Sequence, residues 1–179
     1  MKRALFLDRD GVINEEKEGS YIFSLKEFIW YEGALAALAQ LSQQFDYLFI
    51  VTNQRGVGRG LMSESALKEI HNFLIEAVEK SGGKINAVYY ATAVDSNHPM
   101  RKPNTGMALQ ALKDFPDIDF TQSVMVGNNL SDMQFGRSAG MKTIFLHTTQ
   151  PAIDLPHSLI DAQYESLEQY AKHATIQQS

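Results

Sequence analysis

The feature that most constrains the fold is a repeated alternation of short apolar runs with longer amphipathic segments. Strands are predicted at Ala4–Leu7, Asp46–Thr52, Ile85–Thr92, Ser123–Gly127 and Thr143–Leu146. Apolar residues at helical spacing predict helices at Gly33–Phe45, Ser63–Lys80, Thr105–Asp114, Ser131–Ala139 and around Tyr164–Lys172. Short strands that are apolar throughout are typical of parallel sheets covered by helices on both faces. We therefore predict an α/β fold with a three-layer, doubly wound parallel sheet of the Rossmann-like type.

The length of the chain sets the expected domain organisation. The 179 residues fit a single domain over residues 1–179, with a tail from about residue 150. The end of that tail, Gln177–Ser179, is expected to fray because polar terminal residues have little to pack against. No sequence pattern decides the oligomeric state, so a monomer and a small homo-oligomer both stay open.

Charge, hydropathy and cysteine content narrow the possible partners. A net charge of -5 argues against a nucleic-acid partner, which usually requires a basic face. No apolar run approaches the roughly 20 residues needed to cross a bilayer, and the apolar run before Asp8 is too short for a signal peptide. We therefore expect a cytoplasmic protein without a membrane partner. The absence of cysteine excludes a thiol nucleophile and a cysteine-bound zinc ion.

Two carboxylates directly follow the first predicted strand. Asp8 and Asp10 are two positions apart, so in extended backbone their side chains point to the same side, and Gly11 lets the chain turn away. Ligands in open α/β sheets bind at the carboxyl ends of the strands. Two carboxylates this close repel each other, so they are expected where a cation or a catalytic role compensates the repulsion. A metal-assisted nucleophile would be built here. By itself, however, an Asp-x-Asp sequence also describes a solvated turn.

Three further segments carry polar groups to the same edge of the predicted sheet. Thr52–Gln54 suits phosphate oxygens, Arg101–Pro103 offers a fixed cation, and Gly127–Asp132 adds oxygen ligands. Hard oxygen ligands without thiols favour Mg²⁺. Each segment alone also fits a helix cap or a turn, so only their occurrence together and in this order favours a functional site.

Taken in order, these segments resemble the four motifs of the haloacid dehalogenase (HAD) superfamily of phosphatases. The motifs are Asp8–Asn14, Thr52–Gln54, Arg101–Pro103 and Gly127–Asp132. Residues 3–148 are similar to the branch of histidinol-phosphate and D-glycero-D-manno-heptose 1,7-bisphosphate 7-phosphatases. Further matches to that branch lie at Gly56–Gly60, Tyr89–Tyr90, Asn97–Pro99, Gly106–Met107 and Asp132–Met133. The resemblance implies a Mg²⁺-dependent phosphatase of a small phosphorylated metabolite.

The resemblance assigns catalytic roles to four residues. It implies that Asp8 attacks phosphorus and forms an aspartyl-phosphate, while Asp10 protonates the leaving alkoxide and later deprotonates water. Thr52 would hold the transferring oxygens, and Lys102 would neutralise charge in the transition state. The expected substrate-binding residues are Asn53, Gln54, Arg101 and Asn129. The expected metal ligands are Asp8, Asp10, Asn128 and Asp132.

Two positions depart from the pattern of this branch. Asn128 stands where an acidic metal ligand is usual, and Asn129 stands where a substrate-contacting lysine is often found. The amide removes one negative charge, so Mg²⁺ affinity should fall and Asn128→Asp should tighten the Mg²⁺ dependence. Recognition of a second phosphate is correspondingly open.

The rim of the pocket is also expected to differ from that of many relatives. The chain leaves no room for a large cap domain between its motifs, so loops at residues 14–31, 55–62 and 93–100 must shape the pocket mouth. Many relatives hold zinc in the third loop, but here this loop offers only His98 and no cysteine. We therefore expect no zinc.

The resemblance favours heptose bisphosphate 7-phosphatase activity, with histidinol phosphate as the alternative substrate. A different class of protein, a catalytically weakened phosphate-binding module, is suggested by Asn128. The presence of Asp8 and Asp10 together with Thr52 and Lys102 argues against that class, because a protein that only binds needs no such set.

Overall fold

The chain folds around one parallel sheet, which confirms the predicted fold class. The structure, a computed structural model, describes residues 1–176, so the fraying expected at Gln177–Ser179 lies outside the described residues. Within residues 1–176 the sheet has six strands: β1 (Ala4–Leu7), β2 (Tyr47–Asn53), β3 (Ala87–Ala91), β4 (Val124–Gly127), β5 (Lys142–Leu146) and β6 (Ala162–Tyr164). Their order is β3-β2-β1-β4-β5-β6, and neighbours pair in parallel. β1 therefore lies between β2 and β4.

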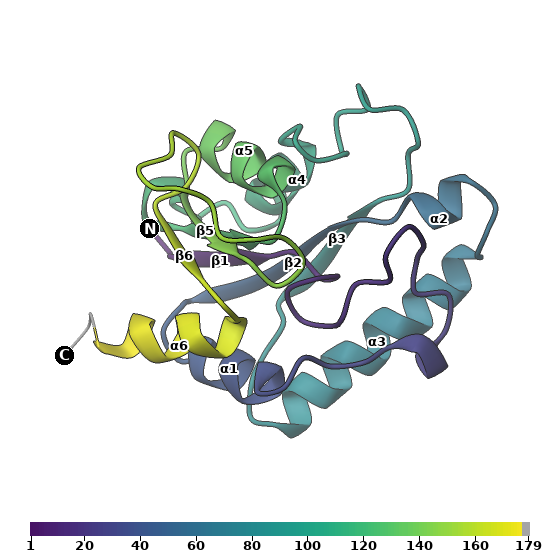
Figure 1. The fold of residues 1–179 in the computed structure, drawn as a ribbon, viewed down its shortest axis with the longest axis horizontal. Helices are drawn as coiled ribbons and strands as arrows, with labels where there is room; N and C mark the ends of the chain where they lie inside the picture. Colours follow the sequence, from purple (N-terminus) through teal and green to yellow (C-terminus); the bar gives the residue numbers. More distant parts are fainter. Residues whose placement is uncertain (177–179) are drawn as a thin grey trace.

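Helices cover both faces of this sheet, as the three-layer prediction requires (Figure 1). They are α1 (Ala34–Leu41), α2 (Arg55–Gly58), α3 (Glu64–Lys80), α4 (Gly106–Asp114), α5 (Leu130–Ser138) and α6 (Leu167–Ile176), with 3-10 turns η1 (Leu25–Glu27) and η2 (Phe120–Gln122). α4 and α5 lie on one face, and α1, α3 and α6 lie on the other. A hydrophobic core lies on each face of the sheet, and alternate residues of β1 point into one or the other. Phe6 belongs to the same core as Met107 of α4, whereas Leu5 belongs to the same core as Leu38 of α1.

Three details of the sequence prediction are wrong. The short helix α2 forms where we predicted a glycine-rich loop, and it lies so close to the chain after β3 that a Cβ at Gly58 would approach the Thr92 carbonyl oxygen to 2.0 Å. The strand β6 was missed because three half-buried residues carry no apolar run. The last helix begins at Leu167, later than the predicted Tyr164, because Tyr164 ends β6.

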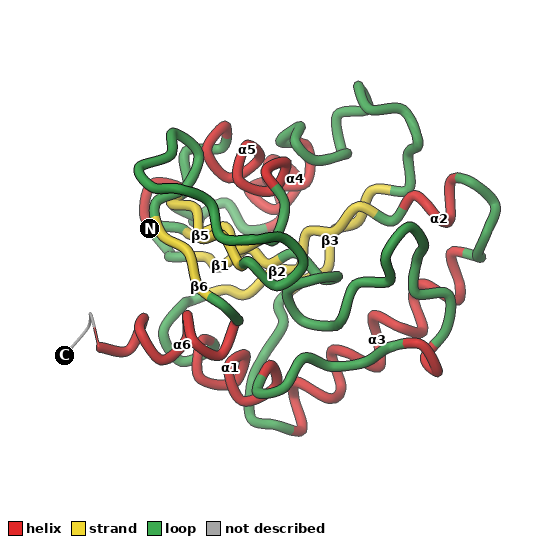
Figure 2. The backbone as a smooth tube through the Cα atoms, in the orientation of Figure 1, coloured by secondary structure: helices red, strands yellow, loops and turns green. Residues whose placement is uncertain are grey.

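A long segment joins β1 to α1 and is mostly loop (Figure 2). Asn14 pairs with Trp30 through an isolated antiparallel bridge, so the residues between them form a closed loop. Phe28 and Trp30 pack against Phe73 of α3, with ring centroids 5.7 and 6.2 Å from it. The aromatic residues thus anchor the base of the loop, and Glu16, Lys17 and residues 19–22 border the site described below.

None of the helices in the described part of the chain combines the length and the apolar character needed to cross a bilayer. A single domain over residues 1–179, a cytoplasmic location and a monomeric or small oligomeric state stay predictions.

Candidate active site

The polar segments found in the sequence meet at the carboxyl edge of the sheet. Because β1 lies between β2 and β4, Asp8 stands between Thr52 on one side and Asn128 on the other. A cavity of about 480 Å³ opens above them. Its lining includes Asp8, Asp10, Glu16, Lys17, Tyr21, Thr52, Asn53, Arg55, Arg59, Arg101, Lys102, Asn129 and Asp132. The size suits a small metabolite.

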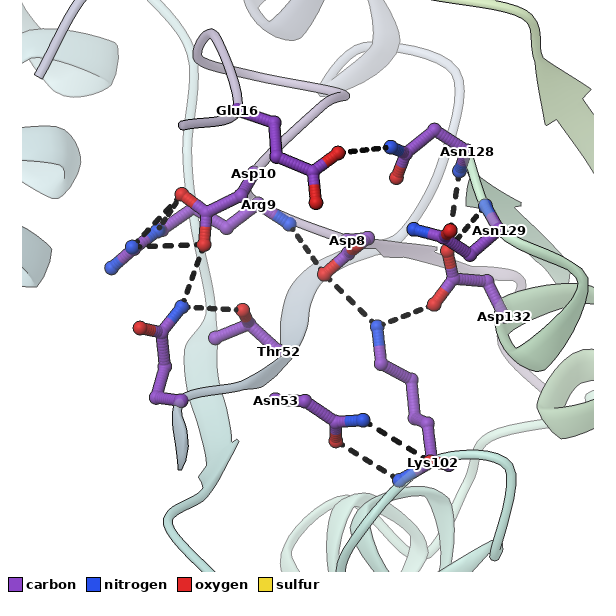
Figure 3. A network of polar contacts seen from close by, with 11 residues as sticks. Asp8, Arg9, Asp10, Glu16, Thr52, Asn53, Lys102, Asn128, Asn129 and Asp132 are labelled. Atoms are coloured by element: carbon purple, nitrogen blue, oxygen red, sulfur yellow. Dashed lines mark hydrogen bonds and ion pairs between the residues drawn. The ribbon is translucent and has the colours of Figure 1, made fainter. Parts of the chain in front are cut away.

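Asp8, Lys102 and Asp132 form a buried chain of charges on the floor of this cavity (Figure 3). The Lys102 Nζ lies 2.9 Å from Asp8 Oδ1 and 2.7 Å from Asp132 Oδ1. The Lys102 side chain is only 1% exposed. The other Asp132 oxygen, Oδ2, accepts hydrogen bonds from the backbone N–H groups of Asn128 and Asn129 at 3.2 and 3.0 Å. Both Asp132 oxygens therefore have protein donors, and the role of this residue as a metal ligand stays a prediction.

The surroundings shift the pKa of both partners of the ion pair. Burial raises the pKa of Asp8 to about 7, against the opposing effect of Lys102 and with help from the charge of Asp132. Burial would lower the pKa of Lys102, but the charges of Asp132 and Asp8 outweigh it and raise that pKa. The lysine therefore stays positive, and a further cation beside Asp8 would favour its ionised, nucleophilic form.

Asn53 fixes the position of Lys102. Its Nδ2 donates to the Lys102 carbonyl oxygen at 3.1 Å, and its Oδ1 accepts from the Lys102 backbone N–H at 3.0 Å. The predicted substrate contact thus uses its amide to hold the loop that follows β3.

Asp10 is surrounded by donors from three side chains. Its Oδ1 accepts from Asn14 Nδ2 at 2.8 Å, and its Oδ2 accepts from Gln54 Nε2 at 2.8 Å. Arg9 Nη2 donates to both oxygens, at 2.9 and 3.0 Å. Gln54 also donates to Thr52 Oγ1 at 2.8 Å, which leaves the Thr52 hydroxyl hydrogen available for a ligand oxygen. Gln54 is only 1% exposed, so it orients Asp10 and Thr52 from below the cavity.

Sequence reasoning missed the support behind Arg9. This arginine is fully buried, and its Nη1 lies 3.2 Å from Nε2 of His71 on α3. Burial, and then the charge of Arg9, lower the pKa of His71 to about 3. The imidazole is therefore neutral and accepts a hydrogen bond from Arg9. The only signal in the sequence was a histidine on the apolar face of a helix, between Leu67 and Leu74.

Sequence reasoning also missed Glu16 and Thr149. The Asn128 Nδ2 donates to Glu16 Oε2 at 3.1 Å and to Thr149 Oγ1 at 2.8 Å. Asn128 is fully buried, yet its Oδ1 has no hydrogen-bond partner among the described residues. The neighbouring Asn129 lines the cavity and accepts a hydrogen bond from Gln150 through Oδ1 at 3.0 Å.

The donor set fits a hard divalent cation. In the described part of the chain no three histidine or carboxylate side chains form a metal site by themselves. A site here therefore needs amide or backbone oxygens beside Asp8, and the unpaired, buried Asn128 Oδ1 is such an oxygen. His98, by contrast, accepts from the Met100 backbone N–H through Nδ1 at 3.2 Å, as a loop residue would.

Cations surround the mouth of the cavity. Arg55, Arg59 and Arg101 line it together with Lys17. Arg59 stacks over the Tyr21 ring at 5.9 Å, and Lys17 forms an ion pair with Glu27 at 2.8 Å. The Arg101 guanidinium donates to the Val94 carbonyl oxygen. Two of the predicted rim loops thus border the cavity directly, while the third supports Arg101.

Comparisons with known proteins agree with this geometry. A family model for HAD-hydrolase-like proteins matches residues 99–159. D-glycero-alpha-D-manno-heptose-1,7-bisphosphate 7-phosphatase of Campylobacter jejuni is 36% identical over 80% of this chain and 81% of its own length. D-glycero-beta-D-manno-heptose-1,7-bisphosphate 7-phosphatase of Rhodopseudomonas palustris is 35% identical over 77% of this chain and 79% of its own. D,D-heptose 1,7-bisphosphate phosphatase of B. bronchiseptica, solved with magnesium and phosphate, has a TM-score of 0.84 and 27% identity, with 99% of each chain covered.

Proposed function

The chain belongs to the heptose-bisphosphate phosphatase family of HAD-like hydrolases, and we propose that it removes the 7-phosphate of a D-glycero-D-manno-heptose 1,7-bisphosphate. The observation that carries the reaction type is the buried Asp8 carboxylate, held 2.9 Å from Lys102 on the floor of a cavity with a cationic mouth. A carboxylate so placed can attack the phosphorus of a bound phosphate, while the lysine offsets the charge that builds up there.

The proposed reaction proceeds in two displacements. Asp8 forms a bond to phosphorus as the sugar alkoxide leaves, and Asp10 supplies the proton to that alkoxide. Asp10 then takes a proton from the water that cleaves the aspartyl-phosphate. Its donors Asn14 and Gln54, both at 2.8 Å, hold the carboxyl group in place for the two transfers. The Thr52 hydroxyl and nearby backbone N–H groups hold the transferring oxygens.

Mg²⁺ is the cofactor that this site suits best. Asp8, the Asp10 backbone carbonyl and Asn128 Oδ1 would hold it. When bound, the cation offsets the repulsion between Asp8 and a dianionic phosphate. The magnesium and phosphate in the B. bronchiseptica structure support this assignment.

The substrate proposal is supported by the relatives and by the charge of the rim. A bisphosphate carries a second dianion, and Arg55, Arg59 and Arg101 line the cavity mouth where it would lie. Relatives are named for the alpha and for the beta anomer, at 36% and 35% identity. Anomer preference is therefore part of the test.

Phosphate release tests the proposal directly. Wild type and Asp8→Asn are assayed with Mg²⁺ on both heptose 1,7-bisphosphate anomers, histidinol phosphate and an aryl phosphate. We expect one bisphosphate anomer to have the highest kcat/KM and Asp8→Asn to release no phosphate from any substrate. A higher kcat/KM for histidinol phosphate would refute the substrate. If wild type releases no phosphate from any of the four, the protein is a phosphate-binding module.

A further inference from the structure

We propose that Glu16 forms one Mg²⁺-binding unit with Asn128: it orients the amide so that Oδ1 faces the site, and it carries the negative charge that position 128 lacks. This inference rests on the proposed function only in taking Mg²⁺ as the cation. Glu16 belongs to none of the four motifs, and it reaches the site from the loop that follows β1. In Figure 3 its carboxylate faces the Asn128 amide beside Asp8.

The orientation of the Asn128 amide follows from its two acceptors. An ionised carboxylate only accepts hydrogen bonds, so the group 3.1 Å from Glu16 Oε2 must be the NH₂ of Asn128. The second N–H points to Thr149 Oγ1 at 2.8 Å. A reversed amide would place its oxygen against the Glu16 carboxylate and lose that hydrogen bond, whereas the Thr149 hydroxyl can donate as well as accept and would pair with either end of the amide. Glu16 therefore determines which atom of Asn128 faces the site.

The remaining atom of that amide is an acceptor without a donor. Asn128 is fully buried, and among the described residues nothing donates to its Oδ1. A buried acceptor left unpaired is costly, and a cation would satisfy it. Asp8 directly follows β1 and Asn128 directly follows the neighbouring strand β4, so the two oxygens belong to one edge of the sheet. A hydrogen bond from a ligand residue to a carboxylate is also the usual outer support of a metal site.

The charge of the site changes place but is not lost. In the branch that this chain resembles, an acidic residue is usual at position 128. Here the carboxylate belongs to Glu16, one hydrogen bond of 3.1 Å away from Asn128. An aspartate at position 128 would face Glu16 as a like charge. The effect of Asn128→Asp on Mg²⁺ affinity should therefore depend on the charge at position 16. We expect one carboxylate, at either position 16 or position 128, to support Mg²⁺ binding.

A charge swap tests this coupling. We would measure the Mg²⁺ dissociation constant by calorimetry for wild type, Glu16→Gln, and the double variant Glu16→Gln with Asn128→Asp. The matched control is Glu18→Gln, which removes the same charge from the same loop at a position that does not line the cavity. The rise in Tm on adding Mg²⁺ is a second readout that needs no catalysis.

We expect Glu16→Gln to weaken Mg²⁺ binding about 10-fold or more, Glu18→Gln to leave it unchanged, and the double variant to regain most of the loss. In the double variant the new amide at position 16 can donate to the new carboxylate at position 128. An unchanged dissociation constant in Glu16→Gln, or a double variant no better than Glu16→Gln, would overturn the proposal. Phosphate release is measured separately. If the heptose bisphosphate is not hydrolysed, the Mg²⁺ dissociation constants still test the role of Glu16.

Discussion

Acidification should destabilise the protein through His71, because burial and the charge of Arg9 lower the pKa of this residue. His71 is 4% exposed and accepts a hydrogen bond from buried Arg9 at 3.2 Å. Its pKa falls from 6.5 to about 3, with burial as the larger cause and the Arg9 charge as the smaller. Between these values the unfolded chain binds a proton on this residue and the folded chain does not. The free energy of unfolding therefore carries no penalty from His71 above pH 6.5. It decreases as the pH falls from 6.5 toward 3, because only the unfolded chain takes up the proton.

The expected loss is about 1.4 kcal/mol per pH unit within that interval. Between pH 7.5 and pH 5.0 it amounts to about 2 kcal/mol for this residue alone. Other groups titrate over the same interval, so a comparison variant is needed. His71→Gln serves, because its amide oxygen can still accept from Arg9 but does not titrate.

Urea unfolding of both proteins at pH 7.5 and pH 5.0 measures the effect. We expect the wild type to lose about 2 kcal/mol more than His71→Gln on acidification, because subtraction removes the titrations that the two proteins share. Equal losses in the two proteins would refute the reasoning and would mean that His71 takes up a proton in the folded state.

Two further predictions follow from the same contacts. Lys102→Met should abolish phosphate release and lower the free energy of unfolding by about 3 kcal/mol at pH 7.5. The reason is that Asp8 and Asp132 stay buried without their cationic partner. A free energy of unfolding in urea equal to that of the wild type would contradict this. Gly11→Ala should cost about 2 kcal/mol more than Gly60→Ala. Both glycines have positive φ, 84° and 71°, but a Cβ at Gly11 would lie 2.1 Å from Asn128 Nδ2, whereas Gly60 faces open space. Equal Tm values for these two variants would show that the Asn128 side chain moves aside freely.

The order of elements and the location of the site could be predicted from the sequence. Apolar runs and helical spacing are local signals, and the end of a parallel strand is where its functional groups gather. Asp8, Asp10 and Thr52 are predicted together for that reason, Lys102 is added by the motif order, and the structure brings all four to one cavity. The short elements α2 and β6 escaped prediction because each has too few residues to show a period.

What each polar side chain does could be decided only by the tertiary structure. Gln54 and Asn53 have the residue types of substrate contacts, but Gln54 donates to Asp10 and Asn53 holds Lys102. Glu16 lies 112 residues from Asn128 in the chain, and no spacing rule connects them. The physical reason is that a donor or acceptor is available to a ligand only where no protein group already pairs with it. That pairing depends on which distant segments the fold brings within hydrogen-bond distance.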